Sequence, residues 1–257
     1  MHNFVLMLKK ELWDCWANSK IVLILALGAL LSIAGPYVQS LRNYPVQFSG
    51  QLLSELYYLF LPILLLILIP FMMMGTVAGE LKNHTAASLL VRPIGRAGYI
   101  LSKFVVYYFI FALAVMIVIL FSAVFANAIS FEPIDFSTIW TVLGLMLAFL
   151  AFAVALLLFL STIIKNQLVA GAVGMSLLIA VFTAGKLVAG WTVLLPGKLL
   201  LWVWEIVSLT QYPGMTTDNP YWEGYVYAYS WPALFVALIS TVVLVVFSIL
   251  VMRHREL

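Results

Sequence analysis

The sequence is poor in charge and almost free of cysteine. Only 9% of its 257 residues are charged and 65% are hydrophobic, whereas soluble domains have about 25% charged and about 45–50% apolar residues. This number of charged residues is too small to solvate a surface exposed to water. The composition therefore excludes a soluble enzyme, a disordered tail and a nucleic-acid-binding domain. The single cysteine, Cys15, excludes an intrachain disulfide framework. This composition is typical of a polytopic membrane protein.

Motifs for catalysis and energy conversion are also missing. No Gly-x-x-x-x-Gly-Lys-Ser/Thr segment occurs, so we expect no phosphate-binding loop and no ATPase activity in this chain. The histidines, His2, His84 and His254, lie outside the long apolar runs, and we expect no catalytic residues, cofactor site or metal site. The middle of these runs holds no ionisable residue, which disfavours proton- or sodium-coupled transport. Any energy source is therefore expected to come from a partner.

Long runs without charge predict six membrane-spanning helices. A helix needs about 20 apolar residues to cross a hydrocarbon core about 30 Å thick, and each run is long enough. The short alternating segments of a transmembrane β-barrel are not found. We therefore expect an all-α polytopic membrane protein that forms a single transmembrane domain over residues 1–257. Its spans are predicted at residues 20–41, 56–78, 103–127, 137–163, 167–188 and 228–252.

Positive residues in the short loops predict the orientation of the chain. Lys and Arg are enriched in cytoplasmic loops. Six spans place both termini on one side of the membrane, and the great majority of the Lys and Arg residues fall on that side. The exceptions are Arg42, Lys186 and Lys198. Both termini are therefore expected to be cytoplasmic.

An amphipathic helix is predicted before the first span, over residues 3–18. Phe4, Leu8, Leu12 and Trp16 recur every four residues, which places them on one face of a helix. Such a helix lies in the cytoplasmic membrane interface, with its basic residues near anionic headgroups. The alternative is an N-terminal extension of the first span.

A second short segment is expected on the outer side of the membrane. Residues 198–205 are apolar but too few to cross, and Pro196 and Pro213 bracket them. This pattern predicts a re-entrant or interfacial helix before the last span. Aromatic residues are dense between residues 191 and 231, as in an interfacial belt. An aromatic substrate vestibule is the alternative interpretation.

The loop between the second and third predicted spans carries the most informative motif. Its residues in order are Gly79-Glu80, Thr85, Leu89-Leu90, Arg92-Pro93, Arg96 and Lys103. A short cytoplasmic helix is expected over residues 85–91, ended by Pro93 because proline disfavours helical geometry in the residue before it. A connecting loop whose positive residues only enforce the topology is the alternative.

These loop residues resemble the first cytoplasmic loop of the permease subunits of type-2 ATP-binding-cassette (ABC-2 type) exporters. That loop has Gly-Glu, a threonine, two leucines, a proline, an arginine and a lysine in the same order. Lys10-Glu11-Leu12 resembles the Lys-Glu-Leu of the family's N-terminal elbow helix, and residues 253–257 resemble its basic C-terminal end. One residue departs from the pattern, because His84 stands where the family has glycine before the threonine.

The resemblance implies an exporter subunit driven by a separate ABC ATPase. Two permease copies, identical or closely related, would pair around a central pathway, and two ATPase copies would dock on the helix over residues 85–91, the coupling helix. ATP and Mg would be bound by the ATPase, and the complex would sit among the lipids of a prokaryotic inner or plasma membrane. The implied ATPase-coupling residues are Glu80, Thr85, Leu89, Leu90, Arg92 and Arg96, and the implied elbow-helix residues are Lys10 and Glu11.

The predicted spans also restrict the cargo. An apolar pathway without buried charge suits a hydrophobic or amphipathic substrate, such as a peptide, a toxin, an antibiotic or a lipid-like molecule. It is less suited to a bare ion, because nothing in the spans replaces a hydration shell. Two other classes of function stay open: a self-sufficient secondary carrier or channel, and a non-transporting membrane anchor or assembly protein.

Overall fold

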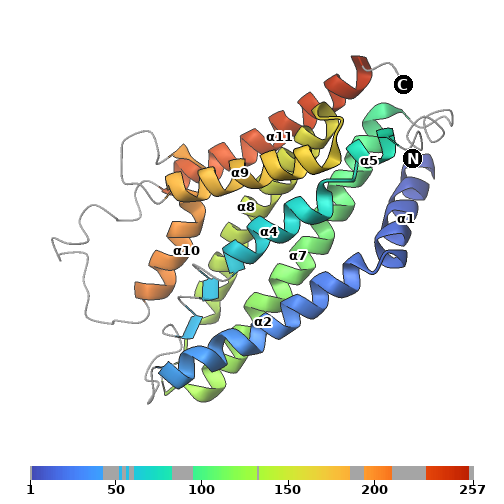
Figure 1. Ribbon diagram of the computed structural model, residues 1–257. Helices are drawn as coiled ribbons and strands as arrows, with labels where there is room; N and C mark the ends of the chain where they lie inside the picture. The colour runs from blue at the N-terminus through green and yellow to red at the C-terminus, as the bar shows by residue number, and fades with distance from the viewer. Residues whose placement is uncertain are drawn as a thin grey trace.

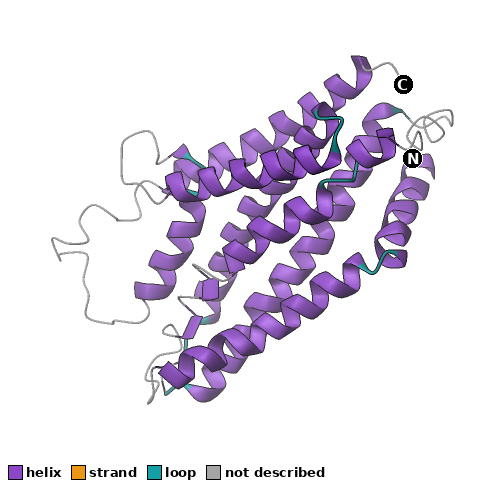
Figure 2. Cartoon of the chain, viewed as in Figure 1, coloured by secondary structure: helices purple, strands orange, loops and turns teal. Residues whose placement is uncertain are grey.

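The computed structural model describes residues 2–42, 52–53, 56–57, 61–82, 95–131, 133–185, 194–209 and 230–254. Its main helices are α1 (His2–Ala17), α2 (Lys20–Arg42), α4 (Leu61–Met73), α5 (Ala78–Lys82), α7 (Arg96–Ile129), α8 (Phe136–Ile163), α9 (Gln167–Gly185), α10 (Lys198–Leu209) and α11 (Ser230–His254) (Figure 1). No strand occurs in these described ranges (Figure 2). The prediction of an all-α protein is confirmed for this part of the chain.

Five helices are long and apolar enough to cross a membrane. They contain the segments Lys20–Val38, Arg96–Ile129, Phe136–Ile163, Gln167–Gly185 and Trp231–His254. Each coincides with one of the predicted spans. A long apolar run within a bilayer forms a helix, because a helix satisfies the hydrogen bonds of its own backbone there. The five helices indicate a multi-pass membrane protein.

The predicted span over residues 56–78 differs from a single long helix. Helix α4 ends at Met73, residues 74–77 form a turn, and α5 begins at Ala78. Gly75 lies in this turn and Pro70 lies inside α4. Proline lacks a backbone N–H and bends helices. Apolar composition is continuous through this region and therefore does not reveal the break.

Helix α8 forms the centre of the bundle. It contacts α4, α7, α9, α10 and α11, and most of its residues are buried. A helix that is apolar on all sides is expected to be surrounded by other elements. Helices α2 and α11 are peripheral and expose large apolar side chains such as Leu30 and Phe235. Such side chains are compatible with contact to lipid.

Both chain ends lie at one end of the bundle, which we call the terminal end (Figure 1). Helix α5 lies there too, whereas α10 lies toward the opposite end. Helix α10 packs against α8, α9 and α11, with Leu199, Leu200 and Val203 buried. The short apolar helix predicted over residues 198–205 is therefore present, and its position relative to a membrane stays a prediction.

Helix α1 packs on the bundle through a face other than the predicted apolar stripe. It bends away from α2 at Asn18 and Ser19, and it contacts α7. Its buried side chains are Met7, Glu11 and Cys15. Leu12 and Trp16, from the predicted apolar stripe, are exposed. The face that docks α1 is therefore centred on Met7, Glu11 and Cys15, and the position of the apolar stripe in the membrane interface stays a prediction.

Candidate functional site

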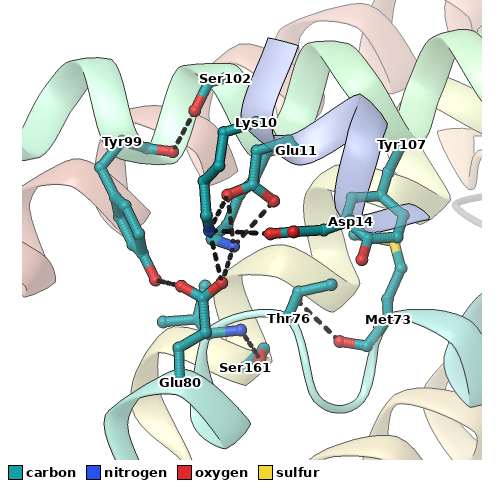
Figure 3. Close-up of polar contacts among 12 residues, drawn as sticks. Lys10, Glu11, Asp14, Met73, Thr76, Glu80, Tyr99, Ser102, Tyr107 and Ser161 are labelled. Carbon is teal, nitrogen blue, oxygen red and sulfur yellow. Dashed lines mark hydrogen bonds and ion pairs between the residues drawn. The ribbon is translucent and has the colours of Figure 1, made fainter. Parts of the chain in front are cut away.

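Charged side chains from three helices meet at the terminal end of the bundle (Figure 3). Lys10 and Glu11 come from α1, Glu80 comes from α5, and Tyr99 and Lys103 come from α7. We call these five residues the charged cluster. They lie up to 93 positions apart in sequence, so tertiary packing alone brings them together.

Lys103 lies at the centre of the charged cluster. Its Nζ donates hydrogen bonds to Glu11 Oε1 at 3.1 Å, to Glu11 Oε2 at 3.0 Å and to Glu80 Oε1 at 2.9 Å. The side chains of Lys103 and Glu11 are only 1% and 3% exposed. An ammonium group has three donors, and each has a carboxylate acceptor here. The ion pair therefore compensates a lysine charge that is almost completely removed from solvent.

Lys10 is the second cation and lies closer to solvent. Its Nζ is 3.2 Å from Glu11 Oε1, 3.4 Å from Glu80 Oε1 and 3.0 Å from Asp14 Oδ2. The two lysines therefore share the carboxylates of Glu11 and Glu80, and Asp14 pairs with Lys10 alone. No single pair holds α1 in place, because each lysine contacts carboxylates from both α1 and α5.

The protonation of the cluster follows from burial and charge. Burial alone would raise the pKa of Glu80, but the neighbouring Lys103, the hydrogen bond from the Tyr99 hydroxyl and Lys10 together hold that pKa below its ordinary value. For Lys10, burial would lower the pKa, and the carboxylates of Glu11 and Glu80 raise it above its ordinary value. Glu80 and Lys10 are therefore both charged at neutral pH.

A side chain from the central helix positions α5. The Ser161 hydroxyl on α8 accepts hydrogen bonds from the backbone N–H groups of Val77 at 3.2 Å and Ala78 at 3.1 Å. The first N–H groups of a helix have no partner within the helix, and Ser161 supplies one. Thr76 closes the preceding turn by donating to the carbonyl oxygen of Met73. These contacts fix the helix that carries Glu80.

The predicted coupling and elbow residues are only partly brought together. Glu80 contacts the predicted elbow residue Lys10 directly and is linked to Glu11 through Lys103. Arg96 is separate from the cluster and donates to the carbonyl oxygens of Met252 and Arg253 on α11. The remaining predicted coupling residues lie outside the described part of the chain: Thr85, Leu89, Leu90 and Arg92.

Lys103 is the site residue that the sequence analysis missed. It entered the analysis only as the last residue of the loop motif, at the expected edge of a span. Helix α7 begins at Arg96, so Lys103 lies two helical turns inside it. A lysine in such apolar surroundings requires a buried partner. The carboxylates on the same predicted side of the membrane, Glu11 and Glu80, were the available signal.

The ion pairs of the charged cluster link α1, α5 and α7 to one another. Removing one partner of a buried ion pair leaves an uncompensated charge, at a cost of about 3–5 kcal/mol. Helices α1, α5 and α7 therefore either move together or separate by breaking several ion pairs at once. In the described ranges, no three His, Cys, Asp or Glu side chains are grouped so as to hold a metal ion.

Comparison with known proteins identifies a family. No curated protein matches the chain. Residues 21–257 match the model of a family described as "Protein of unknown function (DUF2705)". The match includes Glu80, Tyr99 and Lys103 and begins after α1, which carries Lys10 and Glu11. Because the match covers most of the sequence, the chain belongs to the DUF2705 family.

Proposed function

We propose that this chain is the transmembrane permease subunit of an ATP-driven ABC-2 type exporter. One observation carries the proposal: two separate parts of the sequence that resemble such permeases meet in the charged cluster. The N-terminal Lys10-Glu11 pair contacts Glu80 and Lys103, which stand near the two ends of the resembling loop motif. The contact supports the proposal because it joins the two segments that carry the resemblance.

In the proposed mechanism, an ATPase subunit acts on the loop over residues 83–94. Helix α5 ends at Lys82 directly before this loop, and α7 begins at Arg96 soon after it. The charged cluster ties both helices to α1. A displacement of the loop would therefore move α1, α5 and α7 as one body, as in other rigid-body transitions of packed helices. Helix α7 also packs against α2, α8 and α11, which extends the displacement along the bundle.

The proposed topology has six crossings and both termini in the cytoplasm. The second crossing would be residues 56–78, which include α4 and the turn after it, and α10 would be re-entrant from the outer side. Both chain ends lie at the same end of the bundle, as an even number of crossings requires (Figure 1). The excess of Lys and Arg predicted for the same side supports a cytoplasmic location.

The proposed assembly contains two permease copies and two ATPase copies. ATP and Mg would bind to the ATPase, and the permease would move a hydrophobic or amphipathic cargo out of the cytoplasm. The large apolar side chains that α2 and α11 expose are compatible with a lipid boundary or with a second copy.

Affinity purification from native membranes tests this proposal. We expect the tagged chain to retain an ABC ATPase subunit, with two copies for each pair of permeases. The Leu89→Ala/Leu90→Ala variant should lose the ATPase, because these leucines lie on the proposed coupling helix. The matched control is Leu168→Ala/Val169→Ala, an exposed apolar pair at the start of α9.

Two results would contradict the proposal. One is a chain that purifies without an ATP-binding subunit, which would favour a self-sufficient carrier or a membrane anchor. The other is equal ATPase retention by both double variants, which would mean that the loop is not the docking site.

A further inference from the structure

A cavity opens at the terminal end of the bundle, and the cluster residues are not among those that line it. It lies between the bend that joins α1 to α2, the end of α4 with its following turn, and the start of α9. Its volume is about 420 Å³. Pockets that hold small organic ligands have volumes of about 300–1,000 Å³, so the cavity is large enough for a lipid headgroup.

The lining of this cavity is amphipathic. Asn18, Ser19 and Lys20 at the bend and Gln167 at the start of α9 supply polar groups. Leu23, one turn further into α2, also lines the cavity and is 45% exposed. Phe71 on α4 contributes a second apolar side chain and is 60% exposed.

Lys20 is the charged residue among the described residues that line the cavity, and its polar contact within the described ranges is to a tyrosine. Its Nζ lies 3.4 Å from the Tyr107 hydroxyl and 5.7 Å from the centre of the Tyr107 ring. No described carboxylate lies within ion-pair distance of it, whereas Lys10 pairs with three carboxylates and Lys103 with two. A half-buried ammonium group without a carboxylate is a site for an external anion.

The position of the cavity indicates which anion is available. Lys20 is the first residue of α2, one of the helices long enough to span a membrane. Trp13 and Trp16 lie just before it on α1 and are exposed. Tryptophan is enriched at the membrane–water interface. Lys20 therefore lies at the level of lipid phosphates, and its apolar neighbour Leu23 lies at the level of the first methylene groups.

We propose that this cavity binds an anionic phospholipid. The lipid phosphate pairs with the Lys20 ammonium group, and the side-chain amides of Asn18 and Gln167 line the same cavity as further polar groups for the headgroup. An acyl chain lies along Leu23 and Phe71. Basic pockets between membrane helices bind anionic headgroups in this way. The proposal does not depend on the exporter function, because it uses only the cavity and its lining.

Quantification of bound lipid by native mass spectrometry tests the proposal. The protein is purified in detergent with equal amounts of phosphatidylglycerol and phosphatidylcholine. We expect the wild type to retain phosphatidylglycerol preferentially and Lys20→Gln to lose this preference by about fivefold, since one lysine near a membrane surface contributes about 1 kcal/mol. Lys20→Arg should retain the preference. The matched control is Lys9→Gln, an exposed lysine on α1.

A second variant fills the cavity without changing its charge. A Cβ at Gly75 would contact Gln167 Oε1 at 3.4 Å, an ordinary van der Waals distance, so Gly75→Leu places its bulk in the cavity. We expect this variant to lose phosphatidylglycerol as Lys20→Gln does. Because Lys20→Gln and Gly75→Leu act by different means, poor folding of one variant leaves the other as a test.

Two results would overturn the proposal. One is equal lipid retention by Lys20→Gln and Lys9→Gln, which would show that Lys20 has no specific role. The other is displacement of the lipid by soluble glycerol phosphate at millimolar concentration, which would assign the cavity to a soluble phosphate compound.

Discussion

Lys103 is the residue on which the charged cluster depends. It lies in an apolar helix, is almost completely buried and donates to two glutamates from other helices. Glu11 lies 92 residues before it and Glu80 lies 23 residues before it. Sequence reasoning identified Lys10, Glu11 and Glu80 through motifs. It did not predict that they would share one cation, because contacts over such separations depend on how helices pack.

Lys103→Met should lower the free energy of unfolding by about 3–5 kcal/mol, because it leaves the Glu11 carboxylate buried without its main cation. The Glu11→Gln/Lys103→Met double variant should be more stable than the sum of the two single losses predicts, because both changes remove the same interaction. Thermal unfolding in detergent measures the stability of the two single variants and of the double variant.

The control for this cycle is Lys9→Met, at an exposed position of α1. Its effect should stay within about 0.5 kcal/mol. Strictly additive losses for Glu11 and Lys103 would contradict the coupling that their 3.0 Å contact implies.

The lowered pKa of Glu80 predicts that the protein loses stability at acid pH. Because its pKa is lowered in the folded state, its contribution is complete above the ordinary glutamate pKa of about 4.3 and is lost as the pH falls through the lowered value. Melting temperatures should therefore be steady near neutral pH and fall below about pH 4. Glu80→Gln should have a lower melting temperature at neutral pH and a smaller decrease in melting temperature at acid pH. An equal decrease in the two proteins would contradict this assignment.

At the scale of elements, apolar runs predicted five of the long helices well and a sixth segment incompletely. Residues 137–163 became α8 with nearly the predicted bounds. The span over residues 56–78 contains a turn after Met73 instead of one continuous helix. The docking face of α1 includes Glu11, which a hydropathy pattern assigns to the polar side. Both differences arise because hydropathy records the environment of a segment but not the local backbone geometry or its ion pairs.

The close crossing of α9 and the start of α10 makes a prediction at this scale. A Cβ at Gly197 would lie 2.1 Å from the carbonyl oxygen of Val181, a backbone atom that no side-chain rotation can move. Gly197→Ala should therefore destabilise the protein by about 1–3 kcal/mol, as overpacking does. Thermal unfolding measures this loss.

Gly144→Ala is the matched control, because a Cβ at Gly144 on α8 would meet nothing within 4 Å. Alanine is favoured over glycine inside a helix by about 0.5–1 kcal/mol, so this variant should be neutral or more stable. If Gly197→Ala is as stable as Gly144→Ala, the crossing is looser than the structure describes.

For the whole molecule, the position of both termini predicts the topology. Fluorescent-protein fusions at the N- and C-termini should both fluoresce, because both would fold in the cytoplasm. An alkaline phosphatase fusion within residues 43–51 should be active, because this loop would lie outside. A phosphatase that is active at one terminus only would imply an odd number of crossings and would contradict the six-span proposal.

The central claim is that the charged cluster couples α1 to the loop over residues 83–94. Cys15 reports directly on α1, because it is the only cysteine of the chain and lies buried on the docking face. Burial raises the pKa of its thiol, and a buried thiol of raised pKa reacts slowly.

The alkylation rate of Cys15 in a purified complex with the proposed ATPase is therefore the most direct test, with mass spectrometry of the Cys15 peptide as the readout. We predict that adding a non-hydrolysable ATP analogue changes this rate in the wild type, and that Glu80→Gln abolishes the change. Equal rates with and without nucleotide in the wild type would contradict the account.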